Sequence, residues 1–405
     1  MGLKQVYFAL RDQVRFAWAQ RKYGYEPQGK VEDFDFAKLK HIVILKLDGK
    51  LGDTQVMTHF YRNLKNLPHK PTLSVVCPEN LASVYYDVLG FDQVLVSSRK
   101  PRLNEIKSLC QQIIAASQGA GNNGKIDLVL STEPTYRPRD FIFNSMLQPD
   151  FIAGCDPKVK SINLFIFHPH SYNHLVSTAF CDLMAKGHLD YSQPVAYTPL
   201  FTPETLERAL KYVRPNFIEG ATSNEVIETA LAVSLRFNDG EFVFGFNPLG
   251  APKARQMSVE TSAQLISLML QSAPNTKVLL MCHSSKSEYI QAVVSKIAPE
   301  LLDNAQGKSR LLVMPNNTSV LDLGALVHTL DALITVDTAT VHMGCASKIA
   351  QLCFYDNDGV ESCRWAPIGH WAQCVKFSNA AFGTMEPQAF TLVAKSFIAE
   401  QVGKY

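Results

Sequence analysis

The sequence predicts an α/β protein built from two successive doubly wound parallel sheets. One observation is the length, because 405 residues exceed what a single core usually serves and domains commonly hold about 100 to 150 residues. Another is that short, predominantly apolar runs alternate with helical stretches in two series, as expected for parallel strands covered on both faces. A polar, helical stretch at 203–234 separates the series, so we place a first domain at 41–235 and a second at 236–385.

The chain opens with a basic amphipathic segment, 1–40, in which residues 1–25 predict a helix. At about 100° per residue, four cations share one narrow stripe, namely Lys4, Arg11, Arg15 and Lys22. An adjoining face carries the apolar Leu3, Val6, Tyr7, Leu10 and Val14. Such a helix can lie on anionic lipid, but it can equally pack on its own domain with a solvated charged face. Both interpretations stay open.

Two series of candidate strands follow. The first comprises Ile42–Leu47, Leu73–Val76, Val94–Val96, Leu128–Leu130 and Phe151–Ala153. The second comprises Phe242–Phe246, Val278–Met281, Leu311–Met314, Leu333–Val336 and Ile349–Phe354. Helices are predicted over Ser258–Gln271 and Ser285–Ile297, and a last amphipathic helix over Pro387–Gln401. Because open α/β sheets bind ligands outside the carboxyl ends of their strands, functional residues are expected at those ends.

The composition argues for an ordinary globular protein. Apolar residues make up 46%, charged residues 19%, and the net charge of +2 does not indicate the concentrated basic field typical of nucleic-acid binding. The nine cysteines are scattered and never form C-x-x-C, which suits neither a disulfide framework nor a zinc site and favours a reducing cytoplasm. No apolar stretch reaches the roughly 18 residues of a spanning helix, and no signal peptide is indicated.

The first strand leads into a turn and helix that carry a candidate catalytic carboxylate. The segment 46–54 reads K-L-D-G-K-L-G-D-T, in which Gly49 and Gly52 permit a tight turn and Asp53 lies at the helix start. A carboxylate at this edge can act as a general base. It can also be an ordinary helix cap, because Asp is favoured immediately before helices. Asp48 is the second candidate carboxylate.

The second domain offers two segments suited to binding an anion. In 334–342, I-T-V-D-T-A-T-V-H, a buried strand stops at Asp337 and turns into a helix, whose first N–H groups and positive end favour a diphosphate. The loop 247–260 carries Arg255, whose guanidinium can clamp phosphate. The residues of the first segment could instead cap the helix and pack against it. Arg255 could instead be a solvated loop residue.

Other polar residues are candidates for binding an acceptor or a metal. Arg137 and Arg139 follow the strand Leu128–Leu130, where two arginines suit a phosphate or carboxylate, although either can also be a solvated loop residue. Three histidines could in principle bind a metal, namely His168, His170 and His174. No carboxylate or Cys accompanies them at ligand spacing, so we predict no metal site.

Together these motifs resemble the signature of family 9 glycosyltransferases, the heptosyltransferase-like enzymes. Segment 46–53 is similar to the family's K-L-x-x-x-G-D, with one extra residue in the loop. Segment 337–342 is similar to its D-T-G-x-x-H, and 364–369 to its R-W-x-P-x-G. Segment 247–260 resembles N-P-G...K-x-W-P-x-E, with Arg255 in place of the lysine and Met257-Ser258 in place of Trp-Pro. Ala339 stands where the donor motif has Gly, and the residues after the following strand depart from F-G-P-T.

The resemblance implies the GT-B architecture, in which two doubly wound Rossmann-like domains face a central cleft. It implies that 41–235 bind the acceptor, that 236–385 bind a sugar nucleotide, and that the C-terminal helix within 386–405 crosses back. Asp53 takes the place of the catalytic base. The donor-binding candidates are Asn247, Lys253, Arg255, Asp337, Thr338, Ala339 and His342. The acceptor-binding candidates are Lys50, Arg137 and Arg139.

The function implied by the resemblance is inverting transfer of a sugar, with heptose from ADP-L-glycero-D-manno-heptose the favoured donor. The implied acceptor is the inner core of lipopolysaccharide, either Kdo-lipid A or a core heptose. No metal or other cofactor is expected, and the place of action would be the cytoplasm, peripheral on the inner face of the inner membrane of a Gram-negative bacterium. The alternatives are a GT-B enzyme using another nucleotide sugar, a nucleotide-sugar epimerase, and a non-catalytic GT-B-like binding protein.

Overall fold

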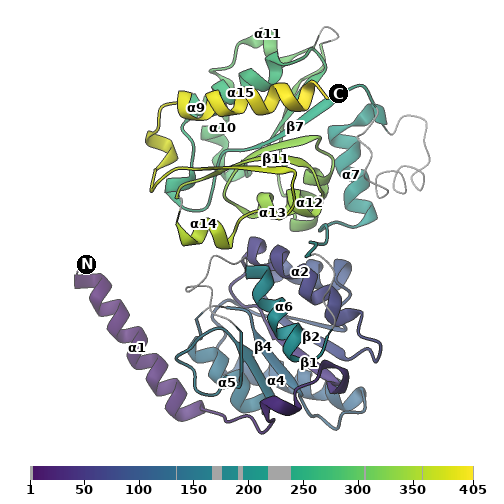
Figure 1. The fold of residues 1–405 in the computed structure, drawn as a ribbon, viewed down its shortest axis with the longest axis vertical. Coiled ribbons are helices and arrows are strands. Elements are labelled where there is room, and N and C mark those ends of the chain that lie inside the picture. Colours follow the sequence, from purple (N-terminus) through teal and green to yellow (C-terminus); the bar gives the residue numbers. More distant parts are fainter. Residues whose placement is uncertain are drawn as a thin grey trace. The chain divides into compact units, whose positions relative to one another are not determined.

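The computed structural model describes residues 3–133, 135–166, 176–189, 195–217, 239–304, 307–357 and 359–404. The chain divides into two compact units, and Figure 1 shows helices on both faces of the sheet in each. Unit 1 comprises Met1–Lys50 with Met57–Val195, and unit 2 comprises Leu51–Val56 with Ala196–Tyr405. The three histidines considered as metal ligands, His168, His170 and His174, lie outside the described residues.

The sheet of unit 1 has six strands in the order β3-β2-β1-β4-β5-β6. They are β1 (His41–Leu45), β2 (Thr72–Cys77), β3 (Gln93–Val96), β4 (Leu128–Ser131), β5 (Phe151–Gly154) and β6 (Leu164–Phe165). All neighbours pair in parallel, and Ile42 of β1 is aligned with Leu73 on one side and Leu128 on the other. The chain reverses its direction of travel across the sheet between β1 and β4, which opens a crevice at their carboxyl ends.

The sheet of unit 2 repeats this topology, in the order β12-β11-β10-β7-β8-β9. Its strands are β7 (Phe242–Asn247), β8 (Thr276–Leu280), β9 (Leu311–Val313), β10 (Ala332–Val336), β11 (Ala350–Tyr355) and β12 (Ala372–Lys376). The reversal here falls between β7 and β10. Every strand expected from the sequence is present to within two residues at each end, whereas the edge strands β6 and β12 were not expected.

Among the described residues, five α-helices belong to unit 1 in full, and a sixth joins it after its first turns. They are α1 (Leu3–Tyr23), α3 (Glu79–Ser83), α4 (Leu103–Gly119), α5 (Pro138–Leu147) and α6 (Val176–Lys186), while α2 (Leu51–Lys65) begins in unit 2. In α4 the buried apolar stripe is Ile106, Leu109, Cys110 and Ile113, at the spacing that one helix face requires.

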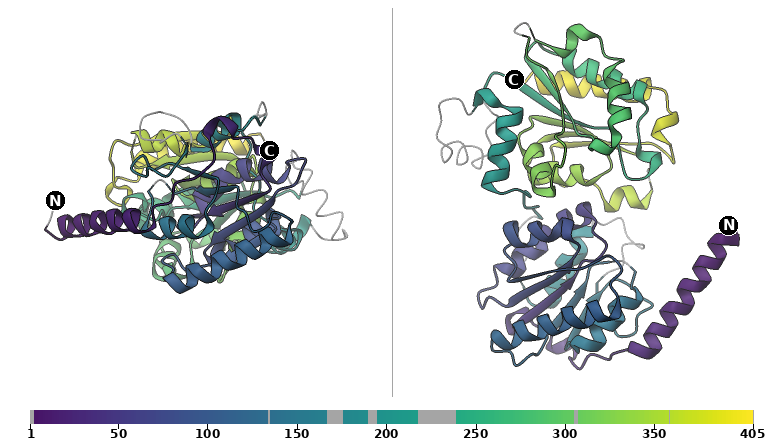
Figure 2. Two further views of the ribbon diagram at one scale, coloured as in Figure 1. Left: turned by 90° about the horizontal axis from the view of Figure 1, so that it is seen from below. Right: turned by 180° about the vertical axis from the view of Figure 1, so that it is seen from behind.

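Helix α1 confirms the helix predicted over residues 1–25 and packs on unit 1 through its C-terminal half. The ring of Phe16 lies 5.2 Å from that of Phe141 in α5, and Ala19 is fully buried. The N-terminal half extends away from the rest of unit 1 (Figure 2). No helix of the described residues is both long and apolar enough to cross a membrane.

Unit 2 is covered by α7 (Pro203–Val213), α9 (Val259–Gln271), α10 (Ser287–Val294), α11 (Pro299–Leu302), α12 (Val320–His328), α13 (Ala339–Ala346), α14 (Val360–Arg364) and α15 (Gln388–Val402). Helix α15 is the one expected to cross back to the first domain. Its buried face, Phe390, Ala394, Phe397 and Ile398, belongs to the core of unit 2, where the helix packs on α9 and β11.

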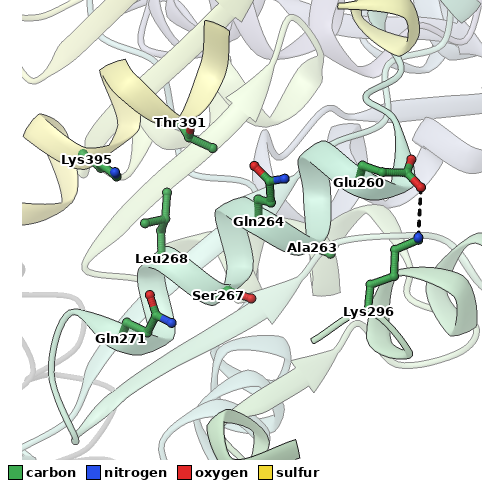
Figure 3. A pocket seen from close by; sticks show the side chains of 9 residues that line it. All are labelled: Glu260, Ala263, Gln264, Ser267, Leu268, Gln271, Lys296, Thr391 and Lys395. Carbon is green, nitrogen blue, oxygen red and sulfur yellow. Dashed lines mark ion pairs between the residues drawn. The ribbon is translucent and has the colours of Figure 1, made fainter. Parts of the chain in front are cut away.

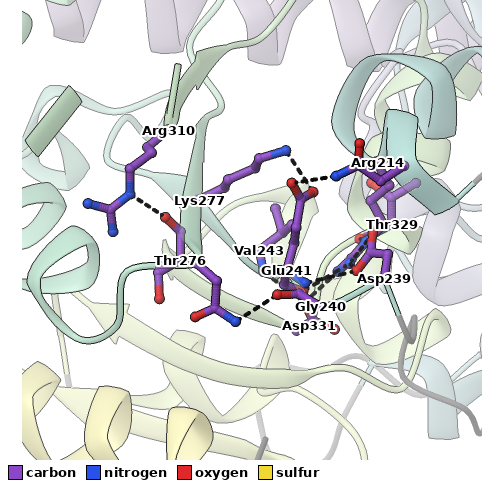
Figure 4. A network of polar contacts seen from close by, with 12 residues as sticks. Arg214, Asp239, Gly240, Glu241, Val243, Thr276, Lys277, Arg310, Thr329 and Asp331 are labelled. Atoms are coloured by element: carbon purple, nitrogen blue, oxygen red, sulfur yellow. Dashed lines mark hydrogen bonds and ion pairs between the residues drawn. The ribbon is translucent and has the colours of Figure 1, made fainter. Parts of the chain in front are cut away.

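A buried ion cluster at the amino ends of β7 and β10 ties α7 to this sheet (Figure 4). Arg214, which follows α7, is fully buried and forms ion pairs with Asp239, at 2.9 Å, and with Asp331. Its Nε donates to the carbonyl oxygen of Thr329 at 2.7 Å. Arg214 and these partners all belong to unit 2, which includes Ala196–Tyr405, whereas the sequence predicts a second domain that begins at residue 236.

Candidate active site

Polar side chains meet at the carboxyl ends of β7 and β10, where the strand order of unit 2 reverses. Asn247 is the last residue of β7, and its Nδ2 donates to the hydroxyl oxygens of Thr338 and Thr340, at 3.0 Å each. The Thr340 hydroxyl also lies 2.8 Å from that of Thr335 inside β10. This network fixes the turn between β10 and α13, for which the sequence predicts anion binding.

Arg255 joins three consecutive strand ends of the same sheet. It lies in a 3₁₀ turn, Lys253–Arg255, after β7, and its Nη1 is 2.7 Å from Oδ2 of Asp337, which follows β10. Its Nε is 3.1 Å from Oδ1 of Asp356, which follows β11. The guanidinium is about three-quarters buried, with 23% of its side chain exposed. Because five N–H donors are available on Arg, donors remain for a further anion.

The amino end of α13 is suited to a negatively charged group. Thr338 is the N-cap in an extended conformation, and its side chain does not cap the first turn. The Thr338 hydroxyl therefore does not accept a hydrogen bond from the first N–H groups of the helix. These N–H groups form the positive end of the helix dipole. Ala339, at the position where the resembled motif has Gly, is the first helical residue and is half-buried.

His342 lies one turn further along α13 and is held neutral. Its ring is buried, and burial lowers the pKa of the imidazole to about 4. Nδ1 has no hydrogen-bond partner among the described residues, and the rings of Tyr197 and Trp365 lie 6.0 and 6.2 Å away. At neutral pH the side chain can therefore donate or accept one hydrogen bond, but it carries no charge.

In unit 1 the turn after β1 has the shape that its glycine predicted. Gly49 has a φ of +66°, and a Cβ there would lie 2.9 Å from Nε of Arg99. Asp48 accepts hydrogen bonds from Nζ of Lys46, at 2.6 Å, and from the backbone N–H of Lys50, at 3.2 Å. Asp48 is therefore a structural residue of the turn.

Asp53 is not the helix cap that the sequence left open as an alternative. Lys50 is the N-cap of α2, and Asp53 is the third residue of the helix, in its first turn and half-buried. Lys50 is exposed at the same turn. A negative charge in the first turn of a helix interacts favourably with the helix dipole, and a carboxylate can accept a proton from a hydroxyl.

Arg137 and Arg139 lie in different environments after β4. Arg137 is exposed and precedes α5, where its backbone N–H donates to Asp140 at 2.6 Å. Arg139 is paired with the buried Glu133 and also donates to the carbonyl oxygen of Arg99. Both line a cleft of about 1300 Å³ in unit 1. Beside them, burial raises the pKa of Asp140 to about 7.

A second concavity, of about 540 Å³, lies between α9 and α15 and is drawn in Figure 3. Its lining is mostly neutral, and its Lys296 is paired with Glu260 at 3.1 Å. None of the predicted site residues lines it. Within the described ranges, no group of three or more His, Cys, Asp or Glu side chains is arranged to hold a metal ion.

The structure thus brings Asn247, Arg255, Asp337 and Thr338 together, whereas Lys253 stays exposed without entering the ion-pair cluster. Two further residues of this polar cluster were not predicted from the sequence. Thr340 links Asn247 to β10, and Asp356 holds Arg255. The signal for Thr340 was the run T-V-D-T-A-T, and the signal for Asp356 was its place directly after a strand.

No family model matches the chain, and no curated protein matches it in sequence. Solved structures do match it. A glycosyl transferase family 9 protein from Veillonella parvula DSM 2008 is 16% identical with a TM-score of 0.67, covering 91% of this chain and 99% of that one. The ADP-heptose lps heptosyltransferase II of E. coli is 12% identical with a TM-score of 0.64, covering 90% and 99%.

The E. coli heptosyltransferase WaaC, solved with ADP-2-deoxy-2-fluoro heptose, is 13% identical with a TM-score of 0.58, covering 88% of this chain and 99% of that one. At such identities the likeness concerns the fold. The two parallel sheets of this chain, each with its strand order reversing once, form the GT-B fold shared by these family 9 glycosyltransferase structures.

Proposed function

We propose that the protein is an inverting glycosyltransferase that transfers heptose from ADP-L-glycero-D-manno-heptose to the inner core of lipopolysaccharide. The observation that carries this proposal is the cluster at the β7–β10 reversal, where Asn247, Arg255 and Asp337 surround the amino end of α13. That is where a doubly wound sheet binds nucleotides. The E. coli relatives in fold include a heptosyltransferase solved with ADP and with an ADP-heptose analogue.

On the donor side, the diphosphate would lie against the first turn of α13. Its charge is offset there by backbone N–H groups, by the remaining donors of Arg255 and by the exposed Lys253. Asp337, fixed by Arg255 at 2.7 Å, is placed to accept hydrogen bonds from sugar hydroxyls. Neutral His342 adds one hydrogen-bonding nitrogen without adding charge.

On the acceptor side, Asp53 would take the proton of the attacking hydroxyl as its oxygen bonds to the anomeric carbon and the bond to ADP breaks. One displacement of this kind inverts the anomeric centre. Lys50, Arg137 and Arg139 would bind anionic groups of the acceptor. The nine cysteines are all free, and seven are buried, which suits a reducing cytoplasm at the inner face of the inner membrane.

Thermal unfolding with a panel of nucleotide sugars tests the donor assignment, because selective binding to the folded state raises the melting temperature. The expected result is a shift with ADP and ADP-heptose that exceeds the shift with UDP sugars. Product analysis with Kdo-lipid A then separates transfer from epimerisation, which would alter the donor alone. Binding without any turnover would identify a non-catalytic protein, and no binding to any nucleotide would overturn the proposal.

Replacing Arg255 by alanine is expected to raise the KM for the donor about 10- to 100-fold, since charge-assisted contacts of this kind contribute about 1.5 to 3 kcal/mol. Arg255→Lys should recover only part of the loss, because an ammonium cannot hold Asp337 and Asp356 in the two-sided way that the guanidinium does. The matched control is Arg310→Lys, a buried arginine that donates to backbone carbonyls away from this cluster. Equal donor KM values for wild type and Arg255→Ala would refute the assignment.

Chelation is expected to leave turnover nearly unchanged. The carboxylate that could compete for a divalent ion, Asp356, accepts hydrogen bonds at Oδ1 from Arg255, at 3.1 Å, and from Asn357, at 3.0 Å. A cation at Oδ1 would compete with the guanidinium, whose charge would itself offset that of the diphosphate. The measurement is initial rate with and without EDTA. A large loss restored by magnesium or manganese would redirect attention to Asp356.

A further inference from the structure

The cleft of about 1300 Å³ in unit 1 has two walls of different origin. One wall is α1, through residues between Arg11 and Trp18. The other consists of segments that follow β1, β3, β4 and β5, including Asp48, Arg99, Arg137 and Lys158. The cleft therefore opens at the carboxyl ends of the unit 1 strands, where ligands of such sheets bind.

The charges in this cleft do not balance. Each acidic side chain of the lining is already engaged: Asp12 by Arg11, Asp48 by Lys46, Glu133 by Arg139, and Asp156 by the backbone N–H groups of Tyr136 and Lys158. In the part of the chain that the structure describes, five cations of the lining form no ion pair, namely Arg15, Arg99, Lys100, Arg137 and Lys158. Unpaired cations around one concave surface attract a polyanion.

The wall formed by α1 is held in place by core packing. Phe16 contacts Phe141 and belongs to a buried cluster with Ala19, Tyr136 and Ile152. Arg15, next to Phe16, is therefore carried by the part of α1 that is fixed to unit 1. Arg15 therefore lines the cleft because the helix that carries it is packed against the core of unit 1.

The same helix exposes an apolar stripe. Val6, Leu10, Val14 and Trp18 recur every fourth residue, and their exposed fractions are 51%, 60%, 61% and 53%. Trp18 also lines the cleft, so the stripe begins at the cleft and runs along the free half of α1. A ligand with anionic groups next to apolar chains matches both surfaces at once, as in helices that lie at lipid interfaces.

We propose that α1 forms one wall of the acceptor site, where Arg15 and Arg137 bind phosphate or carboxylate groups of a lipid-linked acceptor while the apolar stripe contacts its acyl chains. This inference rests on the proposed function for the statement that the ligand is the acceptor. It assigns the amino-terminal helix a place in substrate binding and explains why its cations and its exposed apolar residues lie on adjoining faces.

The test compares two charge reversals on one helix. Arg15→Glu alters the cleft, whereas Arg21→Glu alters an exposed residue of α1 that does not line it. Binding is measured with detergent micelles of lipid A, of Kdo-lipid A and of dephosphorylated Kdo-lipid A, so that phosphate and carboxylate recognition are read separately. We expect Arg15→Glu to weaken at least one interaction about tenfold or more, equal to about 1.4 kcal/mol, and Arg21→Glu to change none more than about twofold.

A further arm isolates the apolar stripe. Leu10→Ser with Val14→Ser should weaken binding of acylated Kdo-lipid A but leave its deacylated form unchanged. Equal effects of the two charge reversals on every micelle would overturn the proposal, because α1 would then act as a general cationic surface. ADP affinity is measured in parallel. If the wild type binds no ADP, the proposed function fails, while the micelle results still decide whether the cleft binds the amphiphile.

Discussion

Turnover of the Asp53→Asn variant is expected to fall about 10²- to 10⁴-fold, the range that general-base catalysis commonly supplies. The structure supports this expectation by its placement, since Asp53 lies in the first turn of α2 at the carboxyl end of β1. Asn keeps the size of the side chain but cannot take up the proton of the acceptor hydroxyl. The measurement is kcat with saturating donor and acceptor, accompanied by ADP affinity and melting temperature.

The control for this prediction is Asp48→Asn, five residues earlier in the same turn. Because Asp48 is bonded to Lys46 and to the backbone of Lys50, its loss should lower stability more than it lowers turnover at a temperature where the protein is folded. For Asp53→Asn we expect the reverse, a large loss of turnover with a small loss of stability. The interaction of a first-turn carboxylate with the helix dipole contributes only about 0.3 to 1 kcal/mol to stability. Near-normal kcat in Asp53→Asn would return the residue to a structural role.

Much of the fold could be predicted because buried parallel strands leave a strong signal. The run Ile42–Leu45 is apolar at every position, the run Leu333–Val336 at every position but Thr335, and the structure buries each of these residues. The edge strands lack that signal. Strand β12 is exposed or half-buried along its length, and β6 has two residues, so neither shows the apolar run that marks a central strand.

For the site, the sequence could predict features formed by neighbouring residues but not contacts between residues far apart in the chain. The strand-to-helix turn at Asp337 and Thr338 is local, so the residues themselves predict the turn and the helix start that the structure shows. The partnership of Arg255 with Asp356 joins residues 101 positions apart and depends on β7, β10 and β11 being neighbours. The structure shows Arg255 paired with Asp337, while its role as a phosphate clamp stays a prediction.

The burial of Arg214 could not be predicted from the sequence, because neither the residue nor the P-N-F segment after it indicates a fully buried side chain. Its replacement by methionine is expected to lower the free energy of unfolding of unit 2 by about 3 to 5 kcal/mol, the cost of leaving buried partners unpaired. The side chains of Asp239 and Asp331 are each 1% exposed, and burial raises the pKa of Asp331 even beside the guanidinium. In a Trp18→Phe background, the fluorescence of Trp365 and Trp371 follows denaturant unfolding of unit 2 alone.

The matched control is Arg208→Met, because Arg208 also pairs with an aspartate, Asp322, at 2.6 Å, but with 60% of its side chain exposed. An exposed pair of this kind contributes about 1 kcal/mol or less. The Arg214 cluster lies at the amino ends of β7 and β10, whereas the proposed donor site lies at their carboxyl ends. The Arg214→Met variant should therefore keep wild-type ADP affinity at temperatures where it is folded. Equal stability losses in Arg214→Met and Arg208→Met would contradict the structural role of the buried cluster. Loss of ADP binding in folded Arg214→Met would contradict its separation from the donor site.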